Sequence, residues 1–205
     1  MLNESEQKAN RKKNKRTLIL LVLIMVSPIL ASYLLYFSNV RPGSVNYGDL
    51  LEVKPLAGTA LNESDKTIFR VRQLRGKWAL ITIDSGACDE SCRQKLYYMR
   101  QVRTIQNTEK DRIERVWLID DGVPPAAELV KEFEGTWLIN AKDSDLLKEF
   151  PAAGSIRDHV YVVDPIGNLM MRFPKDPDPS KMAKDIKRLL KVSQLEHAMG
   201  TDKKH

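Results

Sequence analysis

One segment of the chain limits its possible structures more than any other. From Thr17 to Phe37 the sequence TLILLVLIMVSPILASYLLYF runs through 21 residues without a charged side chain. At 1.5 Å per residue, a helix of this length is about 30 Å long, which matches the hydrocarbon core of a bilayer. A helix buried in a soluble core rarely continues this far without a charge. The segment therefore predicts a single transmembrane helix.

The residues in front of this segment predict its orientation. Residues 1–16 contain six basic and two acidic side chains, and they hold most of the net charge of +6. Because flanking Lys and Arg stay on the cytoplasmic side, we expect an inner (cytoplasmic) membrane protein whose C-terminal domain lies in the periplasm. A cleaved signal peptide is the alternative, but the apolar stretch is long and no clear cleavage site follows it. The concentration of charge in the tail argues against nucleic-acid binding.

The remaining sequence predicts one folded domain. Turn residues and polar side chains mark residues 38–50 as a linker. The predicted organisation is a basic cytoplasmic tail over 1–16, the anchor over 17–37, the linker, a folded domain over 51–196 and a polar C-terminal tail over 197–205.

Within the folded domain, strand-like and helix-like patterns alternate. Strands are expected at 77–84, 114–120, 136–140, 159–164 and 169–173, and helices at 90–107, 125–134, 143–150 and 179–196. The turn Pro165-Ile166-Gly167-Asn168 predicts a hairpin between the last two strands. A strand–helix–strand–helix order followed by a hairpin and a helix is typical of an α/β, thioredoxin-like domain.

The chain has two cysteines, and both lie where the first strong strand meets a helix. Cys88 and Cys92 are four residues apart in SGACDESCRQ, so both sulfurs lie on one side of the helix start. The positive end of a helix favours the thiolate, which is both the nucleophile of disulfide exchange and a soft ligand for Cu(I). The spacing leaves three interpretations open: a structural disulfide, a redox pair or a metal site. A structural role is the weakest of these, because so short a loop adds little stability.

A histidine could complete a metal site with the two cysteines. Of the three histidines, His197 and His205 lie in the polar C-terminal stretch, whereas His159 begins the first strand of the hairpin. In a thioredoxin-like domain the start of that strand faces the cysteine loop. Two thiolates and one imidazole suit Cu(I), and Cu(II) if water or a carboxylate joins them. A structural zinc site would lack its fourth ligand.

Several of these motifs together resemble the Sco/SenC family of copper-binding cytochrome c oxidase assembly proteins. The matching features are the apolar anchor, RGKWALITI, the C-x3-C pair and RDHVYVVDPIGNLMMRF, and the similarity spans about residues 45–190. The resemblance implies a membrane-tethered, exported thioredoxin-like domain in which Cys88, Cys92 and His159 bind copper. The chain departs from the family pattern at the cysteines, which are followed by Asp89 and Arg93 in place of prolines.

From these features we expect a copper metallochaperone for the dinuclear copper site of a cytochrome c oxidase subunit. The main alternative is a membrane-anchored thiol–disulfide oxidoreductase that reduces client cysteines, with Cys88 and Cys92 as its catalytic pair and no metal. An interaction module with a stable disulfide is a third hypothesis. Peroxidase activity is disfavoured because no threonine stands three residues before Cys88.

Overall fold

The structure is a computed structural model that describes residues 4–37 and 46–201. Of residues 4–13, 35–36 and 194–201 only the backbone is described. Part of the predicted basic tail, most of the predicted linker and the last four residues, including His205, lie outside the described residues. The chain divides into two compact units, Met1–Val45 and Asn46–His205.

The first unit consists of one long helix, α1 (Glu4–Phe37). Its stretch Asn14–Leu34 has a mean hydropathy of 2.4 and is long and apolar enough to cross a membrane. Pro28 lies inside the helix without ending it. The predicted apolar helix is therefore present, with nearly the predicted bounds.

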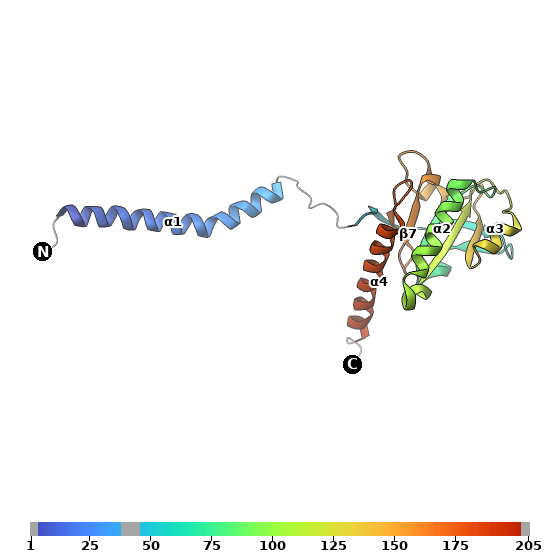
Figure 1. The fold of residues 1–205 in the computed structure, drawn as a ribbon. Coiled ribbons are helices and arrows are strands. Elements are labelled where there is room, and N and C mark those ends of the chain that lie inside the picture. The colour runs from blue at the N-terminus through green and yellow to red at the C-terminus, as the bar shows by residue number, and fades with distance from the viewer. Residues whose placement is uncertain (1–3, 38–45, 202–205) are drawn as a thin grey trace. The chain divides into compact units, whose positions relative to one another are not determined.

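The second unit is built on one eight-stranded sheet (Figure 1). The strands are β1 (Asp49–Pro55), β2 (Thr59–Asn62), β3 (Ile68–Arg70), β4 (Trp78–Asp84), β5 (Ile113–Ile119), β6 (Thr136–Asn140), β7 (Val160–Val163) and β8 (Asn168–Arg172). Their order across the sheet is β1-β8-β7-β4-β5-β6-β2-β3. β4, β5 and β6 run parallel, whereas β7 is antiparallel to β4 and forms a hairpin with β8.

Three α-helices and four 3-10 turns complete the domain. The helices are α2 (Glu90–Thr104), α3 (Ala127–Glu132) and α4 (Pro179–Thr201), and the turns are η1 (Val71–Leu74), η2 (Asn107–Arg112), η3 (Asp145–Glu149) and η4 (Ile156–Asp158). The α/β, thioredoxin-like architecture predicted from the sequence is confirmed.

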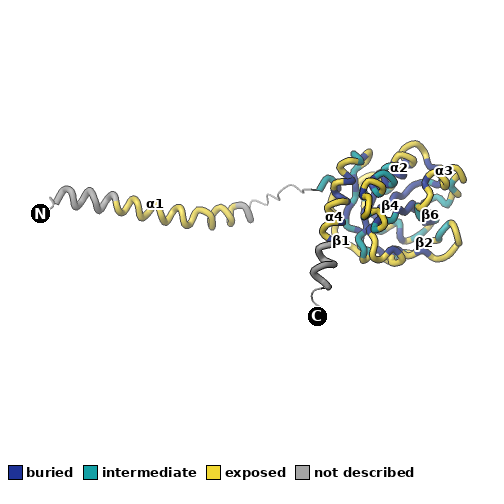
Figure 2. Tube along the Cα trace, turned by 60° about the horizontal axis from the view of Figure 1, so that its bottom comes forward, coloured by how far each residue is buried: buried dark blue, intermediate teal, exposed yellow. Residues whose placement is uncertain are grey.

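The sheet has a different cover on each side. On one side, apolar residues of α2 and α4 such as Met99 and Ile186 pack on Leu80, Val160 and Val162. On the other side, residues of the 3-10 turns and loops pack on the alternate strand positions, among them Tyr161 and Val163. Every residue of β4 is buried, because this central strand is covered on both sides (Figure 2). We call the first side of the sheet the helix side and the second side the turn side.

The structure corrects several predicted boundaries. β1 begins at Asp49, inside the range predicted as linker, and pairs with β8. α4 continues to Thr201, into the predicted polar tail. The predicted helix over 143–150 is the short 3-10 turn η3, and the predicted helix over 125–134 is the shorter α3. β2 and β3 are too short and too exposed for their periodicity to predict them.

Candidate functional site

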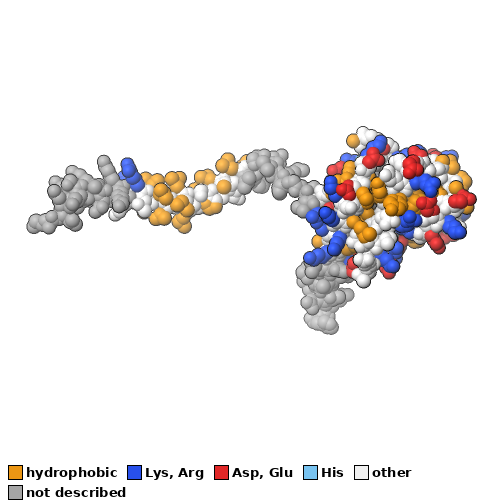
Figure 3. All heavy atoms as spheres, viewed as in Figure 1, with side chains coloured by type: hydrophobic (Ala, Val, Ile, Leu, Met, Phe, Trp, Pro, Cys, Tyr) orange, Lys and Arg blue, Asp and Glu red, His pale blue; other side chains and the backbone are white. Residues whose placement is uncertain are grey.

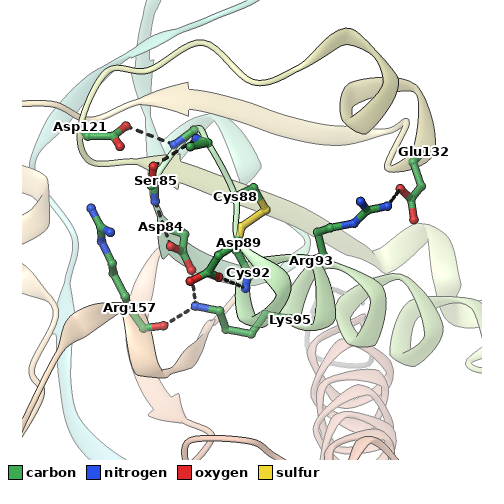
Figure 4. Close-up of a disulfide and its surroundings, with 12 residues drawn as sticks. Asp84, Ser85, Cys88, Asp89, Cys92, Arg93, Lys95, Asp121, Glu132 and Arg157 are labelled. Carbon is green, nitrogen blue, oxygen red and sulfur yellow. Dashed lines mark hydrogen bonds and ion pairs between the residues drawn. A yellow bond between two sulfur atoms is a disulfide. The ribbon is translucent and has the colours of Figure 1, made fainter.

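The two cysteines lie in the turn that leads from β4 into α2, and they form a disulfide (Figure 4). Their Cα atoms are 5.1 Å apart. Cys88 has a φ of 46°, which lies in the left-handed region that favours glycine. The backbone N–H of Cys88 donates to the carbonyl of Ser85 at 3.1 Å and closes the turn. The chain thus adopts a strained conformation at Cys88, where the disulfide forms.

α2 begins directly at the disulfide because Asp89 caps its first turn. The Oδ1 atom of Asp89 accepts a hydrogen bond from the backbone N–H of Cys92 at 2.9 Å. Such a cap satisfies one of the free donors at a helix start and fixes where the helix begins. The cap therefore places Cys92 in the first turn of α2, one helical turn beyond Cys88.

The disulfide is almost closed off from solvent. Cys88 is 7% exposed and Cys92 is 0% exposed. Both belong to a hydrophobic cluster on the helix side of the sheet, together with Leu96, Trp117, Ile119, Leu129 and Phe133. Cys88 is therefore the cysteine of the pair that lies nearer to the surface.

A buried ion pair lies one turn beyond Cys92. The Lys95 ammonium contacts Asp84 Oδ2 at 2.6 Å, and both side chains are less than one tenth exposed. The same ammonium donates to the backbone carbonyl of Arg157 (Figure 4). Lys95 therefore connects the cysteine helix both to the end of β4 and to the segment that leads into β7.

A second cation continues this network along the same edge of the sheet. The guanidinium of Arg157 binds both carboxylate oxygens of Asp120, each at 2.7 Å. These hydrogen bonds raise the pKa of the Arg157 guanidinium, against the opposing effect of burial. Together, Lys95 and Arg157 connect α2 to the ends of β4 and β5 and to the segment before β7.

Asp121 supports the cysteine turn from the neighbouring loop. Its Oδ1 accepts hydrogen bonds from the backbone N–H groups of Gly86 at 3.1 Å and Val123 at 3.0 Å. Burial alone would raise the pKa of Asp121, but hydrogen bonds from Ser85, Val123 and Gly86 outweigh it and lower the pKa. A Cβ atom at Gly86 would lie 1.6 Å from the carbonyl oxygen of Val123, so this position requires glycine.

His159 lies just before β7, at the same edge of the sheet. Its Nδ1 is 2.8 Å from the carbonyl oxygen of Phe173, and because a carbonyl can only accept, Nδ1 carries the proton. Its ring contacts that of Tyr161, a residue of the turn-side cluster, with 5.8 Å between ring centroids. Burial raises the pKa of Tyr161 to about 12. In its neutral form, His159 thus keeps Nε2 as an acceptor or metal ligand.

The structure brings together two of the three predicted ligands. Cys88 and Cys92 are bonded to each other, whereas His159 packs against Tyr161. Among the described residues there is no group of three or more His, Cys, Asp or Glu side chains that could hold a metal ion. His197 lies in the part of α4 whose side chains are not described. The three-ligand copper site stays a prediction.

The charged network of Asp84, Lys95, Asp120 and Arg157 next to the cysteines was not predicted from the sequence. Lys95 falls three residues after Cys92 and one residue before the buried Leu96, and Asp84 ends an otherwise apolar strand. The sequence did contain a signal for a buried ion pair: a lysine lies next to the apolar positions of a helix, and a carboxylate ends the preceding strand. The pairing itself depends on how α2 packs on β4.

The fold and this turn define a thioredoxin-like protein with a disulfide between a central strand and the following helix. The chain belongs to the family described as transmembrane-like, thioredoxin-like, C-terminal domain, whose family model matches residues 78–193. A comparison with curated proteins finds no match.

Several solved structures share the fold. ScoI of Bradyrhizobium japonicum with copper bound is 16% identical, with a TM-score of 0.53 over 66% of this chain and 99% of that one. Yeast Sco1 with copper bound is 15% identical, with a TM-score of 0.54 over 73% and 95%. BsSco, described as a Sco cytochrome c oxidase assembly protein with a disulfide switch, is 14% identical, with a TM-score of 0.52 over 70% and 97%. The resemblance to Sco proteins predicted from the sequence is confirmed at the level of the fold.

Proposed function

We propose that this protein is a membrane-anchored thiol–disulfide oxidoreductase that acts on client cysteines during assembly of the copper site of cytochrome c oxidase. The observation that carries this proposal is the Cys88–Cys92 disulfide at the start of α2, in which Cys88 keeps a small exposed fraction and Cys92 keeps none. The fold similarity to BsSco, a protein described by a disulfide switch and by oxidase assembly, supports the choice of client.

The order of attack in the proposed reaction follows from the different exposure of the two cysteines. In the reduced protein the Cys88 thiolate attacks one sulfur of a client disulfide, and the second client sulfur leaves as a thiolate. The Cys92 thiolate then attacks the Cys88 sulfur of the mixed disulfide and releases the first client sulfur. Two electrons pass to the client and the Cys88–Cys92 disulfide forms again. A dithiol reductant returns the pair to its reduced state.

The local charges act on the Cys88 thiolate in opposite directions. The N-terminus of α2 favours a nearby negative charge. The carboxylates of Asp89 and Glu90 oppose it, although both residues are exposed and their effect is screened by solvent. A free cysteine at this position is therefore activated less than one at a helix start without acidic neighbours.

Copper transfer is the second candidate function, with Cys88, Cys92 and His159 as ligands. Two observations favour it. Similar folds have been solved with copper bound, and the Nδ1 hydrogen bond of His159 to a backbone carbonyl is the arrangement that orients metal-binding histidines. Thiolates bind Cu(I), so the disulfide must be reduced before the site can load. The disulfide form of the protein and its copper-bound form would then exclude each other.

A redox titration of the full chain tests the first proposal. We expect a reduction potential above about −300 mV, because structural disulfides lie below that value. We also expect a disulfide-bonded client peptide to be reduced, with loss of activity in Cys88→Ser and trapping of the mixed disulfide in Cys92→Ser. A lower potential together with an unreactive peptide would contradict the proposal.

An anaerobic Cu(I) titration of the reduced chain separates the two functions. Copper transfer requires one Cu(I) per chain, with binding weakened in Cys88→Ser, Cys92→Ser and His159→Ala. Disulfide exchange alone requires that His159→Ala leaves the reduction potential and the peptide reaction unchanged. His159→Gln serves as the control of similar size that retains a polar side chain.

A further inference from the structure

In the part of helix α4 whose side chains are described, the exposed charged side chains are all basic. The part of α4 with described side chains holds five exposed basic residues: Lys181, Lys184, Lys187, Arg188 and Lys191. Each of them has another of the five three or four residues away, so they lie along one side of the helix. The one acidic residue of this part, Asp185, is buried. Figure 3 shows Lys and Arg side chains on this part of the domain.

The carboxylates near α4 neutralise only part of this positive charge. Acidic side chains on and beside α4 already have basic partners: Glu109 with Arg112, Asp111 with Arg103, Asp178 with Lys181 and Asp185 with Arg188. Within the part of the domain whose side chains are described, Lys184, Lys187 and Lys191 form no ion pair. These three lysines, which we call the α4 lysines, are available to an outside anion.

The chain that comes from α1 is fastened to this same helix. Asp185 Oδ2 accepts hydrogen bonds from the backbone N–H groups of Tyr47 at 2.7 Å and Gly48 at 2.9 Å. The Tyr47 hydroxyl accepts from the backbone N–H of Asp178 at 3.0 Å, and the Lys181 ammonium lies 5.2 Å from the centre of the Tyr47 ring. The buried carboxylate of α4 therefore fixes the point where the chain joins the domain.

The covalent chain limits how far this point can lie from α1. Nine residues, 38–46, separate Phe37 from Tyr47. The ten Cα–Cα steps from Phe37 to Tyr47 span at most about 36 Å. If α1 is the membrane anchor, the helix that carries the α4 lysines is attached within that distance of the bilayer.

We propose that the α4 lysines bind the anionic phospholipid headgroups of the membrane that α1 enters. This proposal rests on the membrane anchoring of the proposed function, and not on its chemistry. Each lysine near an anionic surface strengthens binding by about fivefold, so three lysines give on the order of 100-fold. Tethering raises the local concentration of headgroups, so a modest affinity suffices for the surface to be occupied.

Lysine acylation of the full chain in lipid vesicles tests the proposal. The chain is reconstituted in vesicles of phosphatidylcholine alone or with phosphatidylglycerol, and mass spectrometry gives the labelling rate of each lysine. Lys131, Lys142 and Lys148, which are exposed on α3, in the loop after β6 and on η3, provide the reference rate. We expect the α4 lysines to react at least fivefold more slowly relative to the reference only with phosphatidylglycerol, and 0.5 M salt to remove the difference.

Two variants control for charge. The double variant Lys187→Gln/Lys191→Gln should release Lys184 from protection, whereas Lys131→Gln/Lys142→Gln, which keeps Lys148 as the reference, should not. Equal α4 labelling in both kinds of vesicle, or protection that appears only when an acidic protein is added, would overturn the proposal. Flotation of the vesicles reports anchoring separately, so a chain that fails to float refutes the anchor, whereas one that floats unprotected refutes only the lipid contact.

Discussion

The two segments that carry the proposed site residues are held in different ways. The cysteine segment, Asp84–Cys92, is fastened at many points: Asp89 caps α2, Asp121 binds Gly86, and the disulfide lies in a hydrophobic cluster. The histidine segment, Gly154–His159, has three exposed and three partly buried residues. Its contacts include the Arg157 carbonyl with Lys95, the Arg157 side chain with Asp120, the His159 ring with the Phe173 carbonyl and Ile156 with the turn-side cluster.

This difference assigns separate roles to the two segments. The sulfur pair is held by many contacts, which suits the electron transfer proposed for it. The histidine segment depends on a few polar contacts, so its position can be changed by substituting single residues. The following predictions test this contrast.

The largest effect is expected at the link between the segments. Lys95→Met leaves Asp84 buried without its partner and removes the donor to the Arg157 carbonyl. Breaking a buried ion pair in this way costs about 3–5 kcal/mol of unfolding free energy, measured by urea denaturation. Hydrogen exchange should also increase in the histidine segment.

Lys77→Met is the matched control, because the Lys77–Glu114 pair is partly exposed. It should cost about 1 kcal/mol or less. Equal losses of stability in the two variants would contradict the role of the buried ion pair. So would unchanged hydrogen exchange in the histidine segment of Lys95→Met. The double variant Lys95→Met/Asp84→Asn removes the unpaired charge and should recover part of the stability.

A smaller effect is expected from adding one methyl group to each segment. Gly86→Ala places a Cβ atom 1.6 Å from the Val123 carbonyl oxygen and should cost about 1–3 kcal/mol or more. At Gly154 the nearest atom to such a Cβ, Asp158 Oδ2, is 3.6 Å away, so Gly154→Ala should stay within about 0.5 kcal/mol. Urea denaturation of both variants gives the comparison, and equal losses would show that the cysteine segment is no more tightly packed.

The smallest effect is expected beside His159. The Tyr161 hydroxyl donates to the carbonyl of Pro151 at 3.1 Å, so Tyr161→Phe should cost about 1 kcal/mol at pH 7. Because burial raises the pKa of Tyr161 to about 12, its contribution is complete below about pH 10, where an unfolded tyrosine ionises. The contribution is then lost as the pH rises towards 12.

Thermal unfolding of wild type and Tyr161→Phe between pH 8 and 11 checks this sign. Wild type should lose more stability than the variant as the pH rises above 10. Tyr97→Phe, at a residue whose side chain is 45% exposed, is the matched control. An equal pH dependence in wild type and Tyr161→Phe would contradict the role of burial.

Much of the fold could be predicted because its central elements have strong patterns. β4 and β5 consist mostly of apolar residues, and the turn before Asn168 matches a hairpin in which Gly167 has a φ of 99°. β1 could not be predicted, because an edge strand with mostly exposed residues has no apolar alternation. β2 and β3 are only four and three residues long, too short for a periodicity to be visible.

The site was predictable where chemistry depends on residues close in sequence. The spacing of Cys88 and Cys92 predicted that the sulfurs lie within reach of each other, and the structure joins them, although Cys88 lies before the helix in a left-handed conformation. The surroundings of His159 depend on contacts with Tyr161 and Phe173 across the hairpin, and the Lys95–Asp84 pair depends on how a helix lies on the sheet. Such contacts are set by tertiary packing and are not visible in local patterns.

The short span of the disulfide has a consequence for a working cycle. A crosslink that closes a ring of five residues restricts the unfolded chain little, by about 2 kcal/mol in the loop-entropy description. The two larger core clusters, one on each side of the sheet, contain neither cysteine. The domain should therefore keep its shape in either state, so that a client meets nearly the same surface before and after each transfer.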